Sequence, residues 1–328
     1  MYFLQSPSTD PCFNLALEQV VFEGPSRYAP CCMLWQNHNT IVVGKHQNTL
    51  AEIDSGYVKA RGIQVVRRLS GGGAVYHDLG NVNFTFIAPH AGGKLDFSQF
   101  CIPVIQALAD VGVKAERSGR NDMTIEGRKF SGNSQYVKDG RVMHHGTILY
   151  DSDLTVLSGA LRVSQDKIVS KGLASVRSRV TNVRPYTAQQ PPTPVFLEQL
   201  RQALFRQFPM EPCPLTEAEL ARVARLRDEV YASWEWTYGA SPPCNVVKRR
   251  RVEGCGTVEV HMQVEEGRLA QLTFYGDFFS LTEPAELADH LLGCPLEEGA
   301  LRARLEVCPP ERCFQGMDTD AFCQLLLE

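Results

Sequence analysis

Apolar residues recur with the period of a helix or of a strand in short segments along residues 1 to about 240. Spacings of three and four positions predict helices, which we place at 14–22, 97–111, 196–208 and 215–231. Alternation of apolar and polar positions predicts strands at 33–35, 40–44, 63–66, 81–88 and 146–150, and a hairpin at 123–130. In the strand at 81–88, Val82, Phe84 and Phe86 alternate with Asn83 and Thr85, which indicates one buried face.

A second pattern begins after a proline-containing segment at 239–246. Pro242 and Pro243 lie in this segment and predict a stiff linker. Beyond it, alternation predicts a hairpin formed by 257–264 and 268–274, and helical spacing predicts helices near 283–292 and 319–327. We therefore predict an α+β protein with a large domain at 1–243 and a small α/β domain at 244–328.

The composition narrows the class of protein. The chain has 328 residues, 44% hydrophobic and 21% charged, as expected for a soluble globular protein. Its net charge of -4 gives no reason to expect nucleic acid as the main partner. No segment approaches the ~20 apolar residues of a membrane helix, and the N-terminal residues lack the pattern of a signal peptide. We expect a cytoplasmic protein.

The cysteine count is high, but the spacing favours neither disulfides nor zinc. The chain has 11 cysteines, an odd number, and no C-x-x-C pair. A disulfide framework and a zinc site are therefore both disfavoured. Because most of these cysteines have apolar neighbours in the sequence, we expect reduced core residues.

The segment 67–81, RRLSGGGAVYHDLGN, carries the most chemical information. Three consecutive glycines have a large entropic cost, so we expect their backbone to come very close to another group. Arg67 and Arg68 indicate that this group is anionic. The segment lacks the end of a Walker A loop and has Tyr76 where a dinucleotide fingerprint has its third glycine. It is predicted as a loop between strands, with a plain glycine-rich hairpin as the alternative.

A lysine occupies an unusual position in the segment 127–133, GRKFSGN, shortly after the segment 118–122, SGRND. Lys129 lies between two glycine-bearing turns, where its side chain can point inward between close backbone segments. A buried lysine needs an anionic partner or it loses its proton. A surface lysine is the alternative.

Two other polar segments are candidates for binding. Residues 166–183, DKIVSKGLASVRSRVTNV, are too polar for a core element and are typical of a loop that folds over a phosphate, although, for this segment taken alone, a solvated basic loop is the favoured interpretation. His144 and His145 are adjacent in a predicted strand, so their side chains point to opposite faces. A single metal ion bound by both is therefore disfavoured.

The order of these segments resembles that of a known family. RRLSGGGAVYHDLGN, GRND, RKFSGN, HHGT, KGLASVRSRVTN and SWEWTYG follow one another as in bacterial lipoate–protein ligase A, and the resemblance covers almost the whole chain. It implies the mixed-sheet α+β fold of biotin/lipoate ligases, which is similar to class II aminoacyl-tRNA synthetase catalytic domains, with a C-terminal accessory domain. It also implies an ATP- and Mg²⁺-dependent enzyme that converts lipoate to lipoyl-AMP and pyrophosphate, then transfers the lipoyl group to a protein lysine.

The resemblance assigns expected roles to individual residues. Lys129 matches the catalytic lysine, whose ammonium would bridge the lipoyl carbonyl oxygen and the α-phosphate. Asp122 is expected to hold Mg²⁺ or to orient Lys129. The expected ATP and lipoyl-AMP contacts are Arg68, Gly73, Ala74, Val75, Tyr76 and Lys129; the expected lipoate contacts are Gly71, Gly72, Gly73, His77 and Lys129; the adenylate loop would contribute Lys171, Gly172, Arg177 and Arg179.

The implied partners are apo lipoyl domains of 2-oxoacid dehydrogenase acyltransferase subunits and the glycine-cleavage H protein. Such acceptors present their lysine at an exposed turn, so the contact is expected to be small and transient. We expect a monomer.

Four other functions compete with the ligase. An octanoyl- or lipoyl-transferase of the same superfamily uses a ready-made acyl group, often through a cysteine, but no cysteine lies between Cys101 and Cys213. A transferase that accepts supplied lipoyl-AMP is the hardest to distinguish. A biotin ligase is disfavoured because the basic glycine loop of that family is absent, and a lipoate-binding protein without activity would not need both Lys129 and the adenylate loop.

Overall fold

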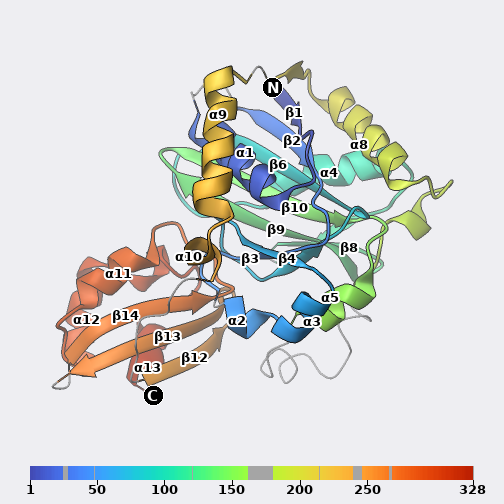
Figure 1. Cartoon of the computed structure of the whole chain (residues 1–328). Helices are drawn as coiled ribbons and strands as arrows, with labels where there is room; N and C mark the ends of the chain where they lie inside the picture. The colour runs from blue at the N-terminus through green and yellow to red at the C-terminus, as the bar shows by residue number, and fades with distance from the viewer. Residues whose placement is uncertain are drawn as a thin grey trace.

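The computed structural model describes residues 1–24, 29–47, 49–119, 121–161, 180–213, 215–238, 246–265 and 268–327. A larger unit, which contains the N-terminus, lies beside a smaller C-terminal unit (Figure 1). This arrangement agrees with the predicted α+β class, because both units combine sheets with separate helices. The boundary predicted at 243/244 falls among residues outside the described ranges and stays a prediction.

The larger unit is built on an eight-stranded mixed sheet. Three edge strands pair in parallel, and the remaining strands pair antiparallel. In spatial order the strands are β11 (Glu211–Pro212), β1 (Tyr2–Gln5), β2 (Cys31–Trp35), β6 (Asn81–Pro89), β10 (Arg141–Leu149), β9 (Arg128–Lys138), β8 (Asp122–Ile125) and β7 (Glu116–Ser118).

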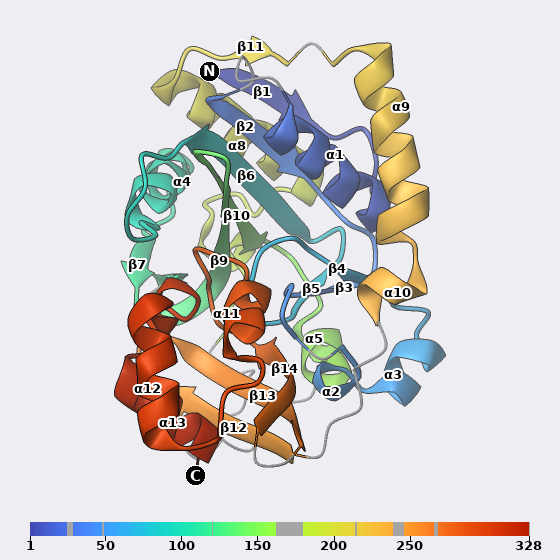
Figure 2. The ribbon, with the colours of Figure 1, turned by 90° about the vertical axis from the view of Figure 1, so that its left-hand side faces the viewer.

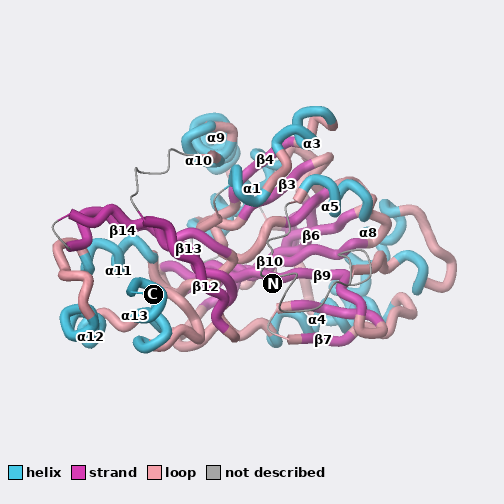
Figure 3. Tube along the Cα trace, turned by 90° about the horizontal axis from the view of Figure 1, so that it is seen from below, coloured by secondary structure: helices cyan, strands magenta, loops and turns pink. Residues whose placement is uncertain are grey.

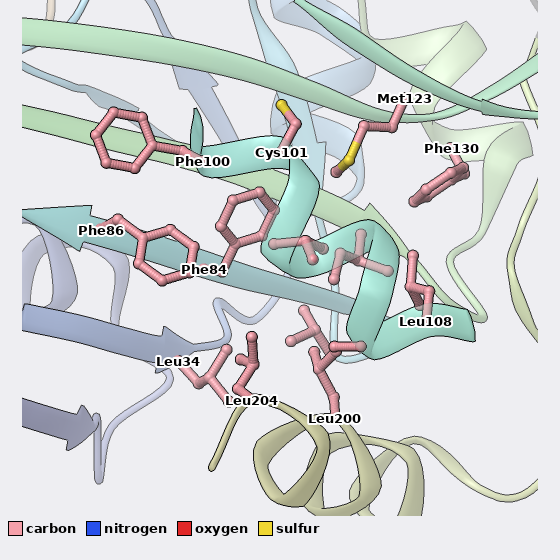
Figure 4. Packing of buried hydrophobic residues seen from close by; sticks show 14 of the residues in the cluster. Leu34, Phe84, Phe86, Phe100, Cys101, Leu108, Met123, Phe130, Leu200 and Leu204 are labelled. Atoms are coloured by element: carbon pink, nitrogen blue, oxygen red, sulfur yellow. The ribbon is translucent and has the colours of Figure 1, made fainter. Parts of the chain in front are cut away.

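Helices cover both faces of this sheet (Figure 2). On one face α4 (Ser98–Asp110) and α8 (Thr193–Gln207) pack against the central strands, and Figure 4 shows their apolar side chains meeting those of β6. On the other face lie α1 (Pro11–Glu23) and α9 (Glu217–Leu226). The predicted helices are thus confirmed. The helix predicted at 215–231 consists of α9 and a π-helical turn, η3 (Arg227–Tyr231). A further short helix, α10 (Trp234–Thr237), follows it.

The strand predicted with one buried face, β6, is buried on both faces. Val82, Phe84 and Phe86 enter the core beneath α4, as predicted. Asn83 and Thr85 are also fully buried, because their side chains lie on the α1 side and form hydrogen bonds there. The one-face prediction was wrong because it treated alternating polar residues as solvated, whereas here they are paired inside the protein.

A second, three-stranded sheet lies beside the main one and supports the glycine-rich segment. It has the order β4 (Gln64–Arg67), β3 (Thr40–Val43) and β5 (Val75–His77). Short helices α2 (Thr49–Glu52), α3 (Ser55–Ala60) and α5 (Leu154–Ala160) flank it, and its own apolar cluster joins it to α3 and α5. The glycines lie between β4 and β5, so the predicted loop between strands is confirmed.

The C-terminal unit has its own sheet and core. Its strands β12 (Val246–Val252), β13 (Gly256–Glu265) and β14 (Arg268–Gly276) form an antiparallel sheet. Helices α11 (Pro284–Leu291), α12 (Glu298–Val307) and α13 (Thr319–Leu327), with the turn η4 (Pro310–Arg312), complete the core, and the view from below separates this unit from the larger one (Figure 3). The sequence did not predict α12, whose buried leucines Leu301 and Leu305 stand among charged residues.

The segment after β14 joins the two units. Phe279 belongs to the core of the larger unit and meets the Phe97 ring at 5.2 Å between centroids. Phe278 stacks on His46 at 4.7 Å. An ion pair of 2.5 Å joins Lys45 to Glu283. These contacts place the C-terminal unit directly behind the glycine-rich loop.

The described cysteines agree with the prediction of reduced core residues. The described cysteines are thiols rather than disulfides, and all except the partly buried Cys308 are buried. Cys244 lies outside the described residues. Within the described residues, no helix is both long and apolar enough to cross a membrane.

The close packing of β9, β10 and β6 around Gly146 can be tested by substitution. A Cβ atom at Gly146 would lie 2.2 Å from Asn133 Oδ1 and 2.5 Å from Phe84 Cζ. Gly146→Ala should therefore lower the free energy of unfolding by about 2 kcal/mol, measured by urea denaturation. In the control Gly299→Ala, in α12, no atom lies within 4 Å of the new Cβ, so stability should be unchanged or slightly higher. Equal midpoints for Gly146→Ala and the wild type would contradict this packing.

Candidate active site

A cavity of about 120 Å³ opens between the glycine-rich loop, α1 and the strands β9 and β10. Its walls combine apolar side chains, backbone of the glycine-rich loop and a few polar groups. The lining residues are Leu15, Trp35, Val42, Arg68, Gly72, Gly73, Ala74, Val75, His77, Asn83, Asn121, Lys129, Gly132, Asn133, Ser134, His145, Gly146 and Thr147. Such a mixture is typical of a small-molecule site.

The Arg68 side chain holds the glycine-rich loop in shape. Its guanidinium donates to the carbonyl oxygens of Val42 at 3.1 Å, Gly71 at 2.6 Å and Gly73 at 2.9 Å, and to Ser70 Oγ at 3.1 Å. Burial lowers the pKa of Arg68 to about 10, so the group stays charged at neutral pH. In this arrangement Arg68 fixes the loop backbone from within, besides lining the cavity.

The close approach predicted for the glycines is found within the chain itself. A Cβ atom at Gly71 would lie 2.2 Å from the Phe278 carbonyl oxygen of the C-terminal unit, and Gly72 N donates to that oxygen at 3.1 Å. Gly72 also has a φ of 89°, which L side chains rarely adopt. The loop is therefore packed against the C-terminal unit on one side and open to the cavity on the other.

The neighbouring Arg67 binds the backbone at the end of the SWEW motif. Its guanidinium donates to the backbone oxygens of Trp236 at 2.9 Å and Thr237 at 2.8 Å, and to three carbonyls at 44–47. Trp236 Nε1 donates back to the Arg67 carbonyl at 2.8 Å. This arginine joins α10 to the turn after β3, a structural role distinct from that of Arg68.

Lys129 and Asp122 form an ion pair at the open side of the cavity. Their Nζ and Oδ1 atoms are 2.7 Å apart, and the two side chains are 40% and 37% exposed. A Cβ atom at Gly132 would lie 3.2 Å from Lys129 Nζ, so the glycine leaves room for the ammonium. The inward orientation predicted for Lys129 is found, and its anionic partner is Asp122. Since the lysine is half-exposed, it keeps access to a ligand.

The last residues of the predicted adenylate loop, 180–183, lie beside Lys129. Thr181 N donates to the Lys129 carbonyl at 2.8 Å, and Arg128 Nη2 donates to the Val180 carbonyl at 3.0 Å. Lys171, Gly172, Arg177 and Arg179 lie outside the described residues. The described end of the predicted loop is therefore in contact with the segment that carries the catalytic candidate.

Two asparagines brace the turn that carries Asp122. Asn121 Nδ2 donates to the Asn133 carbonyl at 2.7 Å, and Asn133 Nδ2 donates to the Asn121 carbonyl at 3.0 Å. Asn133 Oδ1 lies 3.2 Å from His144 Nε2. This reciprocal pairing joins the GRND segment, which contains Asp122, to the RKFSGN segment, which contains Lys129.

The paired histidines lie on opposite faces of β10, as predicted. His144 packs among phenylalanines under α4, and burial lowers its pKa well below the usual value. His145 faces the cavity and contacts Glu18 and Ser70. The described residues contain no group of three or more His, Cys, Asp or Glu side chains arranged to hold a metal.

His77 forms part of the deep wall of the cavity. It is 3% exposed, and its Nδ1 atom lies 3.1 Å from Asn37 Nδ2 and 3.5 Å from Asn83 Nδ2. Since amide nitrogens only donate, Nδ1 accepts and the imidazole is neutral. Burial, with smaller contributions from Arg68 and His145, lowers its pKa to about 3.

The structure brings most, but not all, of the predicted residues into this cavity. Arg68, Gly72, Gly73, Ala74, Val75, His77 and Lys129 line it. Asp122 contacts Lys129 from outside the lining. Gly71 faces the C-terminal unit, and the Tyr76 side chain turns away into the cluster beneath the smaller sheet, where its hydroxyl donates to Asn39 Oδ1. Roles for Gly71 and Tyr76 in ligand contact stay predictions.

Several lining residues were missed by the sequence reasoning. Leu15 and Trp35 reach the cavity from segments that read as ordinary core elements. Glu18 was missed although it is 2% exposed and contacts His145. Its signal was present, since Glu18 is the one acid in the run 15–22, which is apolar apart from Glu18 and Gln19.

Comparison with known proteins identifies the family. The chain matches the model of the lipoyl protein ligase A/B catalytic domain over residues 10–208 and that of the bacterial lipoate protein ligase C-terminus over residues 241–326. It is 38% identical to the lipoate-protein ligase LplJ of Bacillus subtilis, over 99% of this chain and 100% of the relative. It is 37% identical to lipoate–protein ligase 1 of Staphylococcus aureus, over 87% of each chain.

Solved structures agree on the fold. The complex of Plasmodium falciparum LipL1 with lipoate superimposes with a TM-score of 0.76 at 22% identity, covering 99% of both chains. The bi-partite lipoate protein ligase of Thermoplasma acidophilum gives a TM-score of 0.61 at 27% identity, covering 75% of this chain and 98% of that one. The chain belongs to the lipoyl protein ligase A/B family, and within it to proteins that carry the bacterial C-terminal domain.

The buried histidines predict acid sensitivity of the fold. Burial lowers the pKa of His46 and of His77 to about 3, against about 6.5 in an unfolded chain. Below pH 6.5 the unfolded chain binds protons that the folded protein excludes, so stability is complete above pH 6.5 and falls as the pH drops toward 3. Urea midpoints should decrease steadily from pH 7 to pH 4, and less steeply in His46→Phe. A pH-independent midpoint would contradict the neutral, buried state of these histidines.

Proposed function

We propose that this protein is an ATP-dependent lipoate–protein ligase, which forms lipoyl-AMP and then transfers the lipoyl group to a lysine of an acceptor domain. The observation that carries the proposal is the position of Lys129, which projects beside Asp122 into a cavity walled by the glycine-rich loop. The 38% identity to a lipoate-protein ligase over nearly the whole chain supports it.

Lys129 supplies the charge that the first step requires. The lipoate carboxylate attacks the α-phosphorus of ATP, and pyrophosphate leaves. Two anions must meet, so a fixed cation that contacts both lowers the barrier. Lys129 is a half-exposed cation that lines the cavity, and we assign the adjoining wall formed by Arg68, Gly73, Ala74 and Val75 to the nucleotide. Asp122 orients the Lys129 ammonium before the substrates arrive.

The same ammonium serves the second step. The neutral amine of the acceptor lysine attacks the carbonyl carbon of lipoyl-AMP, the C–N bond forms, and AMP leaves with the former carboxylate oxygen. Negative charge develops on the carbonyl oxygen, where Lys129 stabilises it. The segment 166–183, with Lys171, Gly172, Arg177 and Arg179, is the proposed adenylate loop that excludes water from the mixed anhydride.

The interior of the cavity suits an acyl chain. Leu15, Trp35 and Val42 supply carbon surface at its inner end, and His77 is neutral there. We therefore place the hydrocarbon part of lipoate, with its dithiolane ring, against this wall. Gly71, Gly72 and Gly73 are the proposed backbone neighbours of the acyl group.

Magnesium fits this site only together with the nucleotide. Asp122 is one carboxylate and is already paired with Lys129, whereas Mg²⁺ usually combines one or two carboxylates with substrate phosphates. Asp122 and the ATP phosphates would hold the ion, which when bound neutralises phosphate charge.

The proposed protein partners are apo lipoyl domains of 2-oxoacid dehydrogenase acyltransferase subunits and the glycine-cleavage H protein. The archaeal relative was solved as a lipoylation system with its E2 lipoyl domain. We propose a cytoplasmic monomer that forms transient complexes with these acceptors.

A thioester-forming transferase is disfavoured by the described cysteines. Cys101 is fully buried in α4, and burial raises the pKa of its thiol to about 12. A thiol in this state is a poor nucleophile at neutral pH. Cys101→Ala should retain acyl transfer, and loss of transfer by a folded variant would restore this alternative.

One experiment tests the activity as a whole. The protein is incubated with lipoate, ATP, Mg²⁺ and an apo lipoyl domain, and the domain is weighed by mass spectrometry. We expect a gain of one lipoyl group that requires ATP. A gain seen only when lipoyl-AMP is supplied would contradict the full ligase and support the transferase.

Removal of the Lys129 ammonium tests its role. Lys129→Ala should lower the rate of lipoyl transfer by a factor of at least ~10³, since one donor to a developing oxyanion contributes about 10²–10³ and this one acts in both steps. The matched control is Lys138→Ala, on the same strand, where the lysine pairs with Glu23 at 3.7 Å and is 48% exposed. Near-normal transfer by Lys129→Ala would refute the assignment.

Asp122 has a testable role in orientation. Asp122→Asn keeps the shape but removes the charge that pairs with Lys129, so transfer should fall by roughly tenfold to a hundredfold, as for other residues that position a catalytic group. The rate with supplied lipoyl-AMP separates the two possible roles. Equal losses in both half-reactions indicate orientation of Lys129, whereas a loss confined to adenylation that excess Mg²⁺ restores indicates metal binding.

A further inference from the structure

A chain of buried hydrogen bonds runs behind the cavity, and its direction is fixed at both ends. One end is the Trp35 indole and the other is the Arg68 guanidinium, both of which line the cavity. Indole and guanidinium N–H groups only donate. The hydroxyls of Thr85 and Ser70, which accept from them, each keep a proton to donate, and on both branches the acceptors within reach lead to the Glu18 carboxylate.

The first branch is short. Trp35 Nε1 donates to Thr85 Oγ1 at 2.9 Å, and Thr85 Oγ1 donates to Glu18 Oε1 at 2.6 Å. Thr85 lies in β6, which pairs with β2, the strand that ends at Trp35. The orientation of the indole is thus set by a carboxylate from α1.

The second branch crosses the base of the glycine-rich loop. Arg68 Nε donates to Ser70 Oγ at 3.1 Å, so the Ser70 hydroxyl donates to His145 Nε2 at 2.6 Å. His145 Nδ1 then carries the proton and donates to Glu18, 2.9 Å from Oε1 and 3.1 Å from Oε2. The chain requires the Nδ1–H tautomer of His145.

All residues of this hydrogen-bond chain are buried. Glu18 is 2% exposed, Arg68 6% and His145 7%, and Ser70 and Thr85 have no exposed surface. Burying a carboxylate is costly unless it is fully paired, and replacing buried charged groups by apolar residues is often neutral or stabilising. An acid on the buried face of α1 therefore indicates a role in specifying geometry.

We propose that Glu18 is a positioning residue of the acyl site, which orients Trp35 through Thr85 and holds Arg68 and the glycine-rich loop through His145 and Ser70. One carboxylate thereby sets the distance between Trp35 on one side of the cavity and the glycine-rich loop on the other. This proposal rests on the proposed function, because the acid that occupies the cavity is taken to be lipoate. It also assigns His145 as a positioning residue, since both of its ring nitrogens are engaged with protein partners.

Glu18→Gln tests the proposal because it keeps the shape of the side chain and removes its charge. Both carboxylate oxygens lie near His145 Nδ1, so the amide of glutamine places an N–H donor beside the Nδ1–H group in either orientation. The acceptor that orients His145 is thereby weakened, and with it the contact between His145 and Ser70. Selective ¹⁵N labelling of histidine should report Nδ1–H and an unprotonated Nε2 for His145 in the wild type.

The kinetic expectation separates positioning from general damage. In Glu18→Gln, KM for lipoate in lipoyl-AMP formation should rise about tenfold, as expected for a misdirected buried hydrogen-bond network. KM for ATP should rise by a smaller factor, because Arg68 also borders the proposed nucleotide wall, while kcat should change by less than about threefold. Glu23→Gln is the matched control on the same helix, where the acid is only partly buried and pairs with Lys138 and Arg222. It should retain wild-type constants and the Nδ1–H tautomer.

If circular dichroism shows that Glu18→Gln does not fold, two further variants still test the proposal. Thr85→Val cuts only the Trp35 branch and should raise KM for lipoate without changing the His145 tautomer. Ser70→Ala cuts the Arg68 branch and should also raise KM for lipoate.

Specific results would overturn the positioning role. These are a folded Glu18→Gln whose KM for lipoate stays within about twofold of the wild type, or a wild-type His145 that carries a proton on Nε2, or unchanged KM values in both Thr85→Val and Ser70→Ala. If the wild type forms no lipoyl-AMP, the proposed function fails instead, and the tautomer of His145 in the wild type still decides whether the hydrogen-bond chain runs as described.

Discussion

The buried Arg68 guanidinium is the interaction on which the site depends. Four hydrogen bonds from this one group fix the glycine-rich loop to itself, to β3 and to Ser70. A loop with three glycines would otherwise sample many conformations. With Arg68 in place, the loop presents backbone to the cavity on one side and receives the Phe278 carbonyl of the C-terminal unit on the other. The cavity, the smaller sheet and the contact between the two units all meet at this residue.

Much of the fold could be predicted from the sequence, because period and turn chemistry are local properties. The hairpin around Glu126 is an example, since the positive φ values of Glu126 and Gly127 suit the turn that the sequence suggested. The strand β6 shows the limit. Its polar residues looked solvated, yet Asn83 and Thr85 are paired inside the protein, and such pairing depends on partners far away in the sequence.

The candidate site, like the fold, could be predicted only in part. The glycine-rich loop and Lys129 were recognisable because several unusual residues occur together in one segment. Trp35 was not, because it is a single residue in an ordinary strand. Glu18 is an unusual acid in a mostly apolar run and His145 is one of two adjacent histidines, but the roles of both depend on neighbours that are distant in the sequence. The roles of Arg67 and Arg68 also differ in a way that sequence could not separate, since one binds the turn and α10 and the other binds the loop.

The central claim is that the protein activates lipoate itself. Exchange of labelled pyrophosphate into ATP measures this step directly, because it reports reversible adenylate formation without any acceptor protein. The account predicts exchange that depends on lipoate and is lost in Lys129→Ala. Exchange that is absent with lipoate, ATP and Mg²⁺, from a preparation that still transfers the lipoyl group from supplied lipoyl-AMP, would contradict it.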